Sequence, residues 1–141
     1  MSNQNVYRIL NRSSDLVIKV FGKSQAELFS NSAFALFDVM TDVEKVEIRE
    51  KLPLEVEGLD RDDLMVNWMR ELLYLYQGSG YLLKEFQVQE VKGNYVRGEV
   101  RGEKFDPDRH EIRHEILSVA YHQGRMDKIG DQWTAQVIFE L

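Results

Sequence analysis

Two stretches with helical periodicity, set in a chain that otherwise alternates like β-strand, constrain the fold most. The first begins at Ser24, which forms a capping-box pattern with Glu27, and runs to about Thr41. The second begins at the cap Asp60, with acidic residues in its first turn, and ends at the glycines of 78–80. Each carries one apolar stripe that is expected to be core: Phe29, Ala33, Leu36, Phe37 and Met40 in the first, and Leu64, Met65, Trp68, Leu72, Leu75 and Tyr76 in the second.

The rest of the chain is predicted to be strand and turn. Strands are expected at 6–10, 16–21, 81–91, 95–101, 111–123 and 133–141, with a further extended segment over 44–57. The predicted fold is therefore α+β, with two helices packed on one side of a curved, mainly antiparallel sheet of about six or more strands. A length of 141 residues suits a single domain, 1–141.

Charge and composition narrow the classes of function. The net charge is −6, from 18 basic and 24 acidic residues, and the basic residues are scattered, so direct nucleic-acid binding is not expected. An acidic surface suits cations or a basic protein partner. The chain has no cysteine, which excludes disulfides and thiolate metal sites. A polar N-terminus and the lack of a long apolar run predict no membrane association and a cytoplasmic location.

The run 101–122, RGEKFDPDRHEIRHEILSVAYH, combines a polar loop around Asp106 with a predicted strand. Even-numbered positions of a strand point to one face, and the predicted strand has histidines at three of them: His110, His114 and His122. This arrangement suggests a zinc site. Strand positions four apart lie ~13 Å from one another, too far for ligands of one ion unless the strand bends sharply. Exposed or locally bonded histidines are the preferred interpretation, although any of them could join ligands from elsewhere.

This run resembles the archeases, small proteins that assist a GTP-dependent RNA ligase of the RtcB type in tRNA splicing and RNA repair. The resemblance extends over nearly the whole chain, from about Asp15 to Leu141. Leu117 departs from it, because the family usually has Lys at that position. The first helix is similar as well. The matching positions are Gly102–Glu103, Asp106, His110, Glu115–Ile116, Val119, Tyr121 and His122, with Ala33, Ala35–Leu36–Phe37 and 39–42 in the helix.

The resemblance implies a metal site. Archeases bind a divalent cation with two aspartates and the C-terminal carboxylate, which would correspond to Asp15, Glu140 and the terminus of Leu141, with Asp42 as a weaker candidate. Oxygen-only ligands suit Ca²⁺ or Mg²⁺. Arg12 replaces the histidine of the family's first motif, and its charge could weaken metal binding or replace the ion with a salt bridge. From the residues alone, Asp15 at a strand start is a turn or cap residue.

The resemblance also implies a protein cofactor rather than an enzyme. It would promote guanylylation and multiple turnover of the ligase, with Asp106, Glu115 and His122 at the partner-facing end. The sequence shows no P-loop, nucleophile elbow or dinucleotide motif, which favours an accessory role. The alternative is a metal- or ligand-binding or folding-accessory protein that keeps the fold without the ligase role. Leu117 and the altered first motif favour that alternative.

Overall fold

A computed structural model describes residues 6–141, with the backbone alone for 121–125. The described residues form seven strands, two α-helices and one 3-10 helix. The side chains of Tyr121 and His122 lie outside the described part. The elements are β1 (Tyr7–Arg12), β2 (Asp15–Gly22), α1 (Gln25–Met40), η1 (Val43–Lys45), β3 (Glu50–Glu57), α2 (Arg61–Ser79), β4 (Tyr81–Lys92), β5 (Tyr95–Lys104), β6 (Ser118–Ile129) and β7 (Gln132–Glu140).

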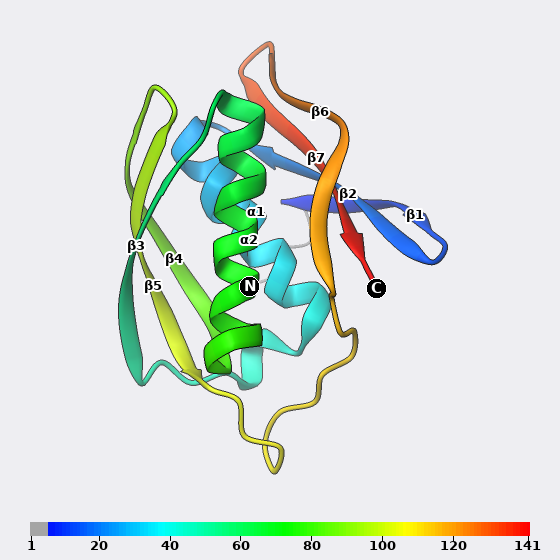
Figure 1. Cartoon of the computed structure of the whole chain (residues 1–141), viewed down its shortest axis with the longest axis vertical. Helices are drawn as coiled ribbons and strands as arrows, with labels where there is room; N and C mark the ends of the chain where they lie inside the picture. The colour runs from blue at the N-terminus through cyan, green and yellow to red at the C-terminus, as the bar shows by residue number, and fades with distance from the viewer. Residues whose placement is uncertain (1–5) are drawn as a thin grey trace.

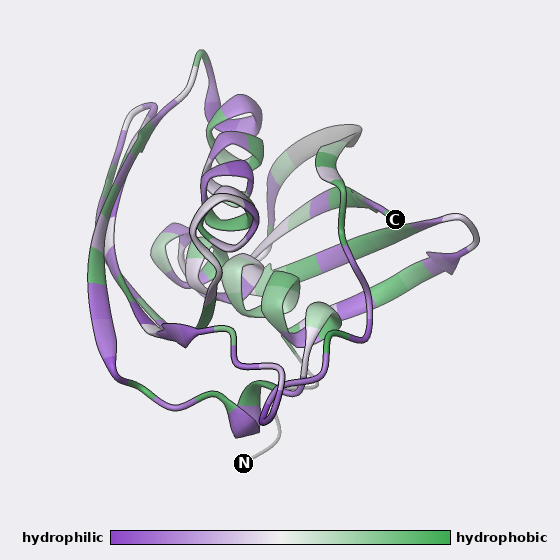
Figure 2. Ribbon diagram, turned by 60° about the horizontal axis from the view of Figure 1, so that its bottom comes forward, coloured by the Kyte–Doolittle hydropathy of each residue, from purple (hydrophilic) through white to green (hydrophobic). Residues whose placement is uncertain are grey.

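Both helices lie between two antiparallel sheets (Figure 1). One sheet has the strand order β1-β2-β7-β6 and the other β3-β5-β4. Helix α1 packs mainly on β4 and β2, and α2 mainly on β6 and β3, so each helix touches both sheets. Figure 2 shows the helices in the opening of the wedge that the sheets form. The α+β class with two helices on antiparallel strands is confirmed, and the strands divide into two sheets because the helix layer has apolar surface on both sides.

The predicted helix caps and core stripes are confirmed. Ser24 Oγ accepts a hydrogen bond from the Glu27 N–H at 3.1 Å, and Asp60 Oδ1 accepts one from the Asp63 N–H at 2.8 Å. The first stripe is fully buried, and in the second only the last two members, Leu75 and Tyr76, are partly exposed. None of the helices in the described residues is long and apolar enough to cross a membrane.

Strand β5 needs glycine where it faces the helices. Gly102 pairs with Leu83, next to an irregularity in the register of β4 between Leu83 and Glu85. A Cβ on Gly102 would lie only 2.0 Å from the Leu82 carbonyl oxygen, and Gly98 is in a similar position further along the strand. Both glycines are strand residues at close backbone approaches.

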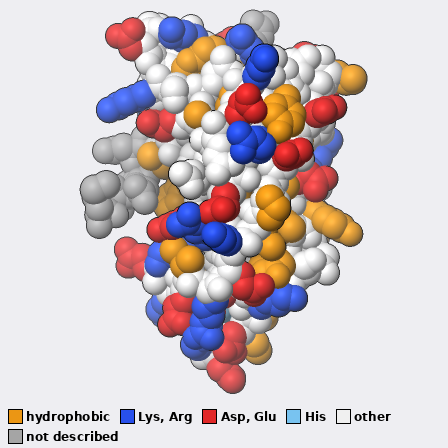
Figure 3. Space-filling view, turned by 90° about the vertical axis from the view of Figure 1, so that its left-hand side faces the viewer, with side chains coloured by type: hydrophobic (Ala, Val, Ile, Leu, Met, Phe, Trp, Pro, Cys, Tyr) orange, Lys and Arg blue, Asp and Glu red, His pale blue; other side chains and the backbone are white. Residues whose placement is uncertain are grey.

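The outer face of the three-stranded sheet carries interleaved charges (Figure 3). Arg97 lies 3.7 Å from Glu90, and Arg101 lies 3.7 Å from Glu85 and 2.7 Å from Glu99. Exposed pairs of this kind contribute little stability, at most about 1 kcal/mol each. They keep this face charged and solvated.

The strand predicted over 111–123 is wrong in its first half. Residues 105–117 form a loop with one isolated bridge, Thr41 to Ile112, and β6 starts only at Ser118. The end of α1 holds the loop: the Arg113 N–H donates to the Met40 carbonyl at 2.8 Å, and Thr41 Oγ1 donates to the Glu111 carbonyl at 2.6 Å. The apolar residues that suggested a strand are instead packed against the core.

A buried carboxylate anchors the start of this loop. Glu103 accepts hydrogen bonds from the Glu47 N–H at 2.7 Å and from Arg109. The Asp106 N–H donates to His110 Nδ1 at 2.9 Å, so the ring proton is on Nε2, which faces Glu103 Oε2 at 2.9 Å. Burial alone would raise the pKa of Glu103, but the hydrogen bonds from Arg109, the Glu47 N–H and His110 outweigh it and lower the pKa to about 2.

Replacing Gly102 with alanine should strongly destabilise the protein. The new Cβ would overlap the β4 backbone, which cannot move without breaking the sheet, and the expected loss is about 3 kcal/mol or more in the free energy of unfolding. Gly130→Ala is the control: Gly130 has open space and a φ of 62°, so only about 1–2 kcal/mol is expected. Urea denaturation measures both variants, and equal losses would contradict the close approach.

Replacing Glu103 with glutamine should cost about 2–3 kcal/mol near neutral pH, because charge-assisted hydrogen bonds are lost in a buried site. The matched control Glu99→Gln, which removes an exposed pair, should cost less than about 1 kcal/mol.

The effect of Glu103→Gln should depend on pH. The pKa of Glu103 is lower in the folded chain, about 2, than the ordinary value of 4.5. The stabilisation is therefore present in full above the ordinary value and is lost as the pH falls through the folded value. The difference in unfolding free energy between wild type and variant should narrow from pH 4.5 downwards, and a difference that stays constant to about pH 3 would contradict this anchor.

Candidate functional site

The two ends of the described fold meet in one cross-strand row. Asp15, the first residue of β2, is the direct partner of Glu140, the last residue of β7, and Glu140 is in turn the partner of Ser118, the first residue of β6. Directly opposite residues point to the same face of a sheet. The next residue, Leu16, is buried against the helices, so the row lies on the outer face of the four-stranded sheet.

Local hydrogen bonds fix the end of β7 in this row. Ser118 Oγ donates to Glu140 Oε1, and the Leu117 N–H donates to the Glu140 carbonyl at 2.7 Å. On the other side, the Ser13 N–H donates to the Asp15 carbonyl at 3.2 Å in the turn between β1 and β2. Figure 1 shows the C-terminus beside the first residues of β6. The carboxylates of Asp15 and Glu140 are therefore presented from backbone that is held on both sides.

The side chains of this row offer oxygen atoms, which are the ligands that hard cations bind. Asp15 and Glu140 supply side-chain carboxylates and Ser118 a hydroxyl, and Leu141 directly follows the row. These are all oxygen ligands, as Ca²⁺ and Mg²⁺ require, and both ions complete their coordination with water or with a ligand's oxygens. Asp15 and Glu140 are partly exposed, which leaves them open to such ligands.

Asp42 is placed elsewhere. Its side chain caps η1, where Oδ1 accepts a hydrogen bond from the Glu44 N–H at 3.2 Å and Oδ2 lies 3.8 Å from Arg113. Across the residues with described side chains, no three of the His, Cys, Asp or Glu type lie close enough to hold one ion. The fold therefore does not bring Asp42 to Asp15 and Glu140.

The register turns Arg12 away from the carboxylate row. Arg12 is the partner of Leu16, so it belongs to the face opposite that of Asp15. Its charge acts instead on Tyr7, whose hydroxyl donates to Asp38 Oδ2 at 2.5 Å. Burial and the bond to Asp38 raise the pKa of Tyr7, and the charge of Arg12 opposes that shift.

Two of the residues expected at a partner-facing end, Asp106 and Glu115, belong to the loop 105–117. Asp106 Oδ1 accepts a hydrogen bond from the Asp108 N–H at 2.9 Å and so shapes the loop. Glu115 is exposed and accepts a hydrogen bond from the Tyr76 hydroxyl at 2.9 Å; burial and this bond raise the pKa of Tyr76 to about 12. The side chain of His122 lies outside the described residues.

Two features were missed from sequence. Ser118 in the row is one, and within the predicted strand over 111–123 no sequence signal singled it out. The other is the buried pair of Glu103 and His110, of which His110 confirms the expectation of a locally bonded histidine. The Gly-Glu at 102–103 was visible as a motif, but its buried charge was not.

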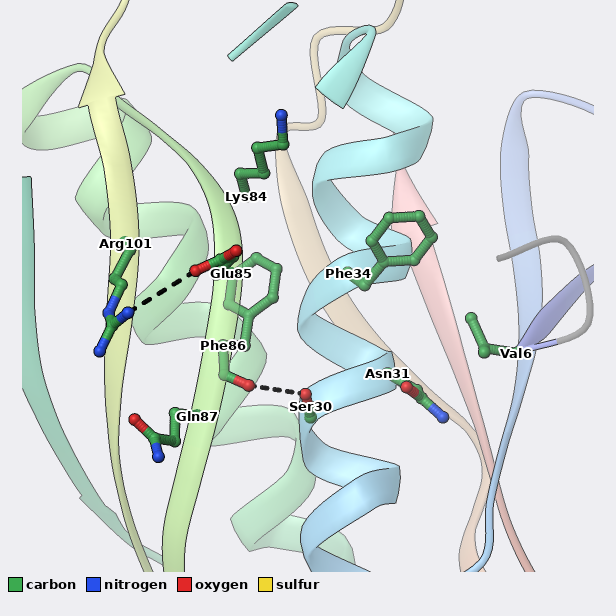
Figure 4. Close-up of a pocket in the computed structure, with 9 residues that line it drawn as sticks. All are labelled: Val6, Ser30, Asn31, Phe34, Lys84, Glu85, Phe86, Gln87 and Arg101. Carbon is green, nitrogen blue, oxygen red and sulfur yellow. Dashed lines mark hydrogen bonds and ion pairs between the residues drawn. The ribbon is translucent and has the colours of Figure 1, made fainter. Parts of the chain in front are cut away.

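A surface pocket of about 520 Å³ lies between α1 and the open edge of β4 (Figure 4). Two of its polar side chains have partners: Ser30 Oγ donates to the Phe86 carbonyl at 2.8 Å, and Arg101 lies 3.7 Å from Glu85. The lining is a mixture of aromatic, amide and charged side chains: Val6, Ser30, Asn31, Phe34, Lys84, Glu85, Phe86, Gln87 and Arg101.

Comparison with solved structures identifies the fold. The solution structure of protein 1598 from Methanobacterium thermoautotrophicum matches with a TM-score of 0.84 over 96% of this chain and 99% of that chain, at 29% sequence identity. The crystal structure of a Thermotoga maritima protein described as an archease and possible chaperone matches with a TM-score of 0.63 over 95% and 96% of the two chains. At 16% identity, that second likeness is one of fold alone.

Sequence comparison identifies the family. The Protein archease of Pyrococcus furiosus is 36% identical over 92% of this chain and 94% of its own length, and that of Methanopyrus kandleri is 33% identical over 94% and 96%. The family model described as Archease protein family (MTH1598/TM1083) matches residues 7–141. This chain belongs to the archease family.

Proposed function

We propose that this archease is an accessory protein of an RtcB-type RNA ligase, promoting guanylylation and repeated turnover of the ligase in tRNA splicing or RNA repair. Its working part is the outer-face row of Asp15 and Glu140 with the terminal carboxylate of Leu141, which holds a divalent cation, Ca²⁺ or Mg²⁺. The observation that carries the proposal is the unbroken pairing of β2 with β7, which places the two carboxylates side by side.

Each residue of the row has a separate task. Asp15 and Glu140 provide the negative charge, and Ser118 orients Glu140 through its hydrogen bond. A bound cation would supply positive charge for phosphate oxygens at the nucleotide site of the ligase. Without such an ion the carboxylates would repel a nucleotide, so the row needs either a cation or a cationic partner surface to act there.

A folding-accessory role is the second candidate. Leu117, beside the row, is 65% exposed and stands where the family usually has Lys. An exposed apolar side chain at this place suits a protein that holds other chains through apolar contacts.

Removing the Asp15 charge should strongly reduce the stimulation of the ligase. In a GTP-dependent guanylylation assay with the cognate ligase, wild type is expected to raise the yield and turnover. Asp15→Asn, which keeps the shape of the side chain, should reduce that stimulation by about tenfold or more. The control Asp131→Asn removes an exposed carboxylate in the turn at the other end of β7 and should act like wild type.

Three outcomes separate the candidates. If Asp15→Asn loses the stimulation of the ligase while Asp131→Asn keeps it, the result supports the ligase role with a cation. Unchanged stimulation by Asp15→Asn would show that the row does not act on the ligase. If wild type gives no stimulation but suppresses aggregation of an unfolding protein, the folding-accessory role replaces the ligase role.

Metal binding should follow the same residues. In a calorimetric Ca²⁺ titration, Glu140→Gln is expected to weaken affinity by about tenfold or more, since the charge count of the ligands sets affinity. Asp42→Asn should leave affinity within about twofold of wild type, because Asp42 caps η1 away from the row. A larger loss with Asp42→Asn than with Glu140→Gln would place the ion elsewhere.

A further inference from the structure

Two positive side chains face each other on the outer face of the four-stranded sheet. Arg8 of β1 and Lys19 of β2 are direct cross-strand partners, and Lys19 lies four residues after Asp15 on the same strand. Alternate residues of a strand point to one face, so Lys19 and its partner share the outer face with the carboxylate row. Gln136 of β7 is the partner of Lys19 on its other side. Arg8, Lys19 and Gln136 therefore form a second cross-strand row, the donor row, whose side chains can all donate hydrogen bonds.

An aromatic ring draws the two charges of the donor row together. The Arg8 guanidinium carbon lies 5.1 Å from the centroid of the Phe21 ring, and Lys19 Nζ lies 5.8 Å from the same centroid. Phe21 is two residues after Lys19 on β2, so its ring is on the outer face as well. The attraction of both cations to one ring holds them over the same part of this face.

No carboxylate balances these two charges. Like charges directly opposite each other on neighbouring strands are destabilising. On the outer face of the other sheet, Arg97 and Arg101 each lie 3.7 Å from a glutamate. Among the residues whose side chains the structure describes, by contrast, no Asp or Glu forms an ion pair with Arg8 or Lys19. Arg8 is exposed and Lys19 is partly exposed, so an anion from solution can reach both.

The carboxylate row is too far away to neutralise the pair. Asp15 and Lys19 are four residues apart on an extended strand, which separates their Cα atoms by ~13 Å. This distance exceeds the Debye length of ~8 Å at physiological ionic strength, so the interaction between the two rows is largely screened. The apolar partners Val17 and Ile138 lie between the rows. The outer face therefore carries two separate polar sites of opposite charge.

We propose that the donor row binds a terminal phosphate group of a nucleotide. A phosphate monoester carries a charge of about −1.5 to −2 at pH 7, which matches the two cations together, whereas one carboxylate would match only one of them. The fork of Arg8 can donate to two phosphate oxygens, Lys19 acts as a point charge, and the Gln136 amide supplies a further donor.

Two sources share this chemistry: a free nucleoside triphosphate and the phosphorylated end of an RNA. A protein that holds a nucleic-acid backbone neutralises many phosphates, and two cations do not suffice for that. The site therefore agrees with the expectation that this chain does not bind nucleic acid along its backbone. It goes beyond the proposed function, because it requires neither the cation at the carboxylate row nor the ligase.

The test follows backbone amide NMR signals while inorganic pyrophosphate is added in metal-free buffer. The signals of Arg8, Lys19 and Gln136 should shift and saturate, and Lys19→Gln should raise Kd by about fivefold or more, because a charged hydrogen-bond donor is lost. The control Lys51→Gln removes an exposed lysine from β3 in the other sheet and should bind within about twofold of wild type. Asp15→Asn should also stay within about twofold, because the two rows are screened from each other.

The result that would overturn the site is an equal loss with Lys19→Gln and Lys51→Gln, since overall charge alone would then explain binding. The absence of any saturable shift would overturn it as well. If wild type binds pyrophosphate as expected but does not stimulate the ligase, the proposed function fails and the phosphate site stands.

GTP and an RNA oligonucleotide with a 3′-terminal phosphate distinguish the two sources. Each is titrated beside its counterpart without the terminal phosphate, guanosine or the same RNA with a 3′-hydroxyl. The phosphorylated ligand that binds more tightly at the donor row is the source. Binding that is equally tight with and without the terminal phosphate, for both ligands, would contradict the proposal.

Discussion

The pairing of β2 with β7 is the constraint on which the rest of the structure depends. It runs without a register break from Asp15 and Glu140 to Gly22 and Trp133, and it joins strands from the two ends of the described fold. Its register also sets the carboxylate row, because a slip by one residue would place Leu16 beside Glu140 and turn Asp15 towards another face. The apolar positions of both strands that face the helices prevent that slip, so the core and the carboxylate row are specified together.

The loop 105–117 is the second support of the same end of the molecule. It is long for a connection within a small domain, but its backbone is held by α1, by α2 and by the buried Glu103. A loop of this length with fixed backbone is typically functional rather than a passive link. Here it leads into Ser118, the first residue of β6 and the partner of Glu140, so the loop supports the end of the sheet that carries the carboxylate row.

Local chemistry explains what could be predicted from the sequence. Caps such as Ser24 and Asp60, and helical stripes such as that around Phe37, depend on neighbours within a few residues, and they are where they were expected. The strand predicted over 111–123 is wrong before Ser118, because Ile112 and Ile116 satisfy the same burial pattern in a loop held by distant helix ends. The division into two sheets was also invisible, since alternation shows which face is buried and not which strands pair. The neighbourhood of Asp15 and Glu140 came from family resemblance, because no local pattern links the two ends of a chain.

The most direct measurement is a crystal structure of the protein grown with Ca²⁺. The account predicts one ion on the outer face of the four-stranded sheet, bound by carboxylate oxygens of Asp15 and Glu140 and by the terminus of Leu141 at about 2.3–2.6 Å, with Ser118 still bonded to Glu140. An ion bound at Asp42 instead, or Asp15 and Glu140 turned apart with no ion between them, would contradict it.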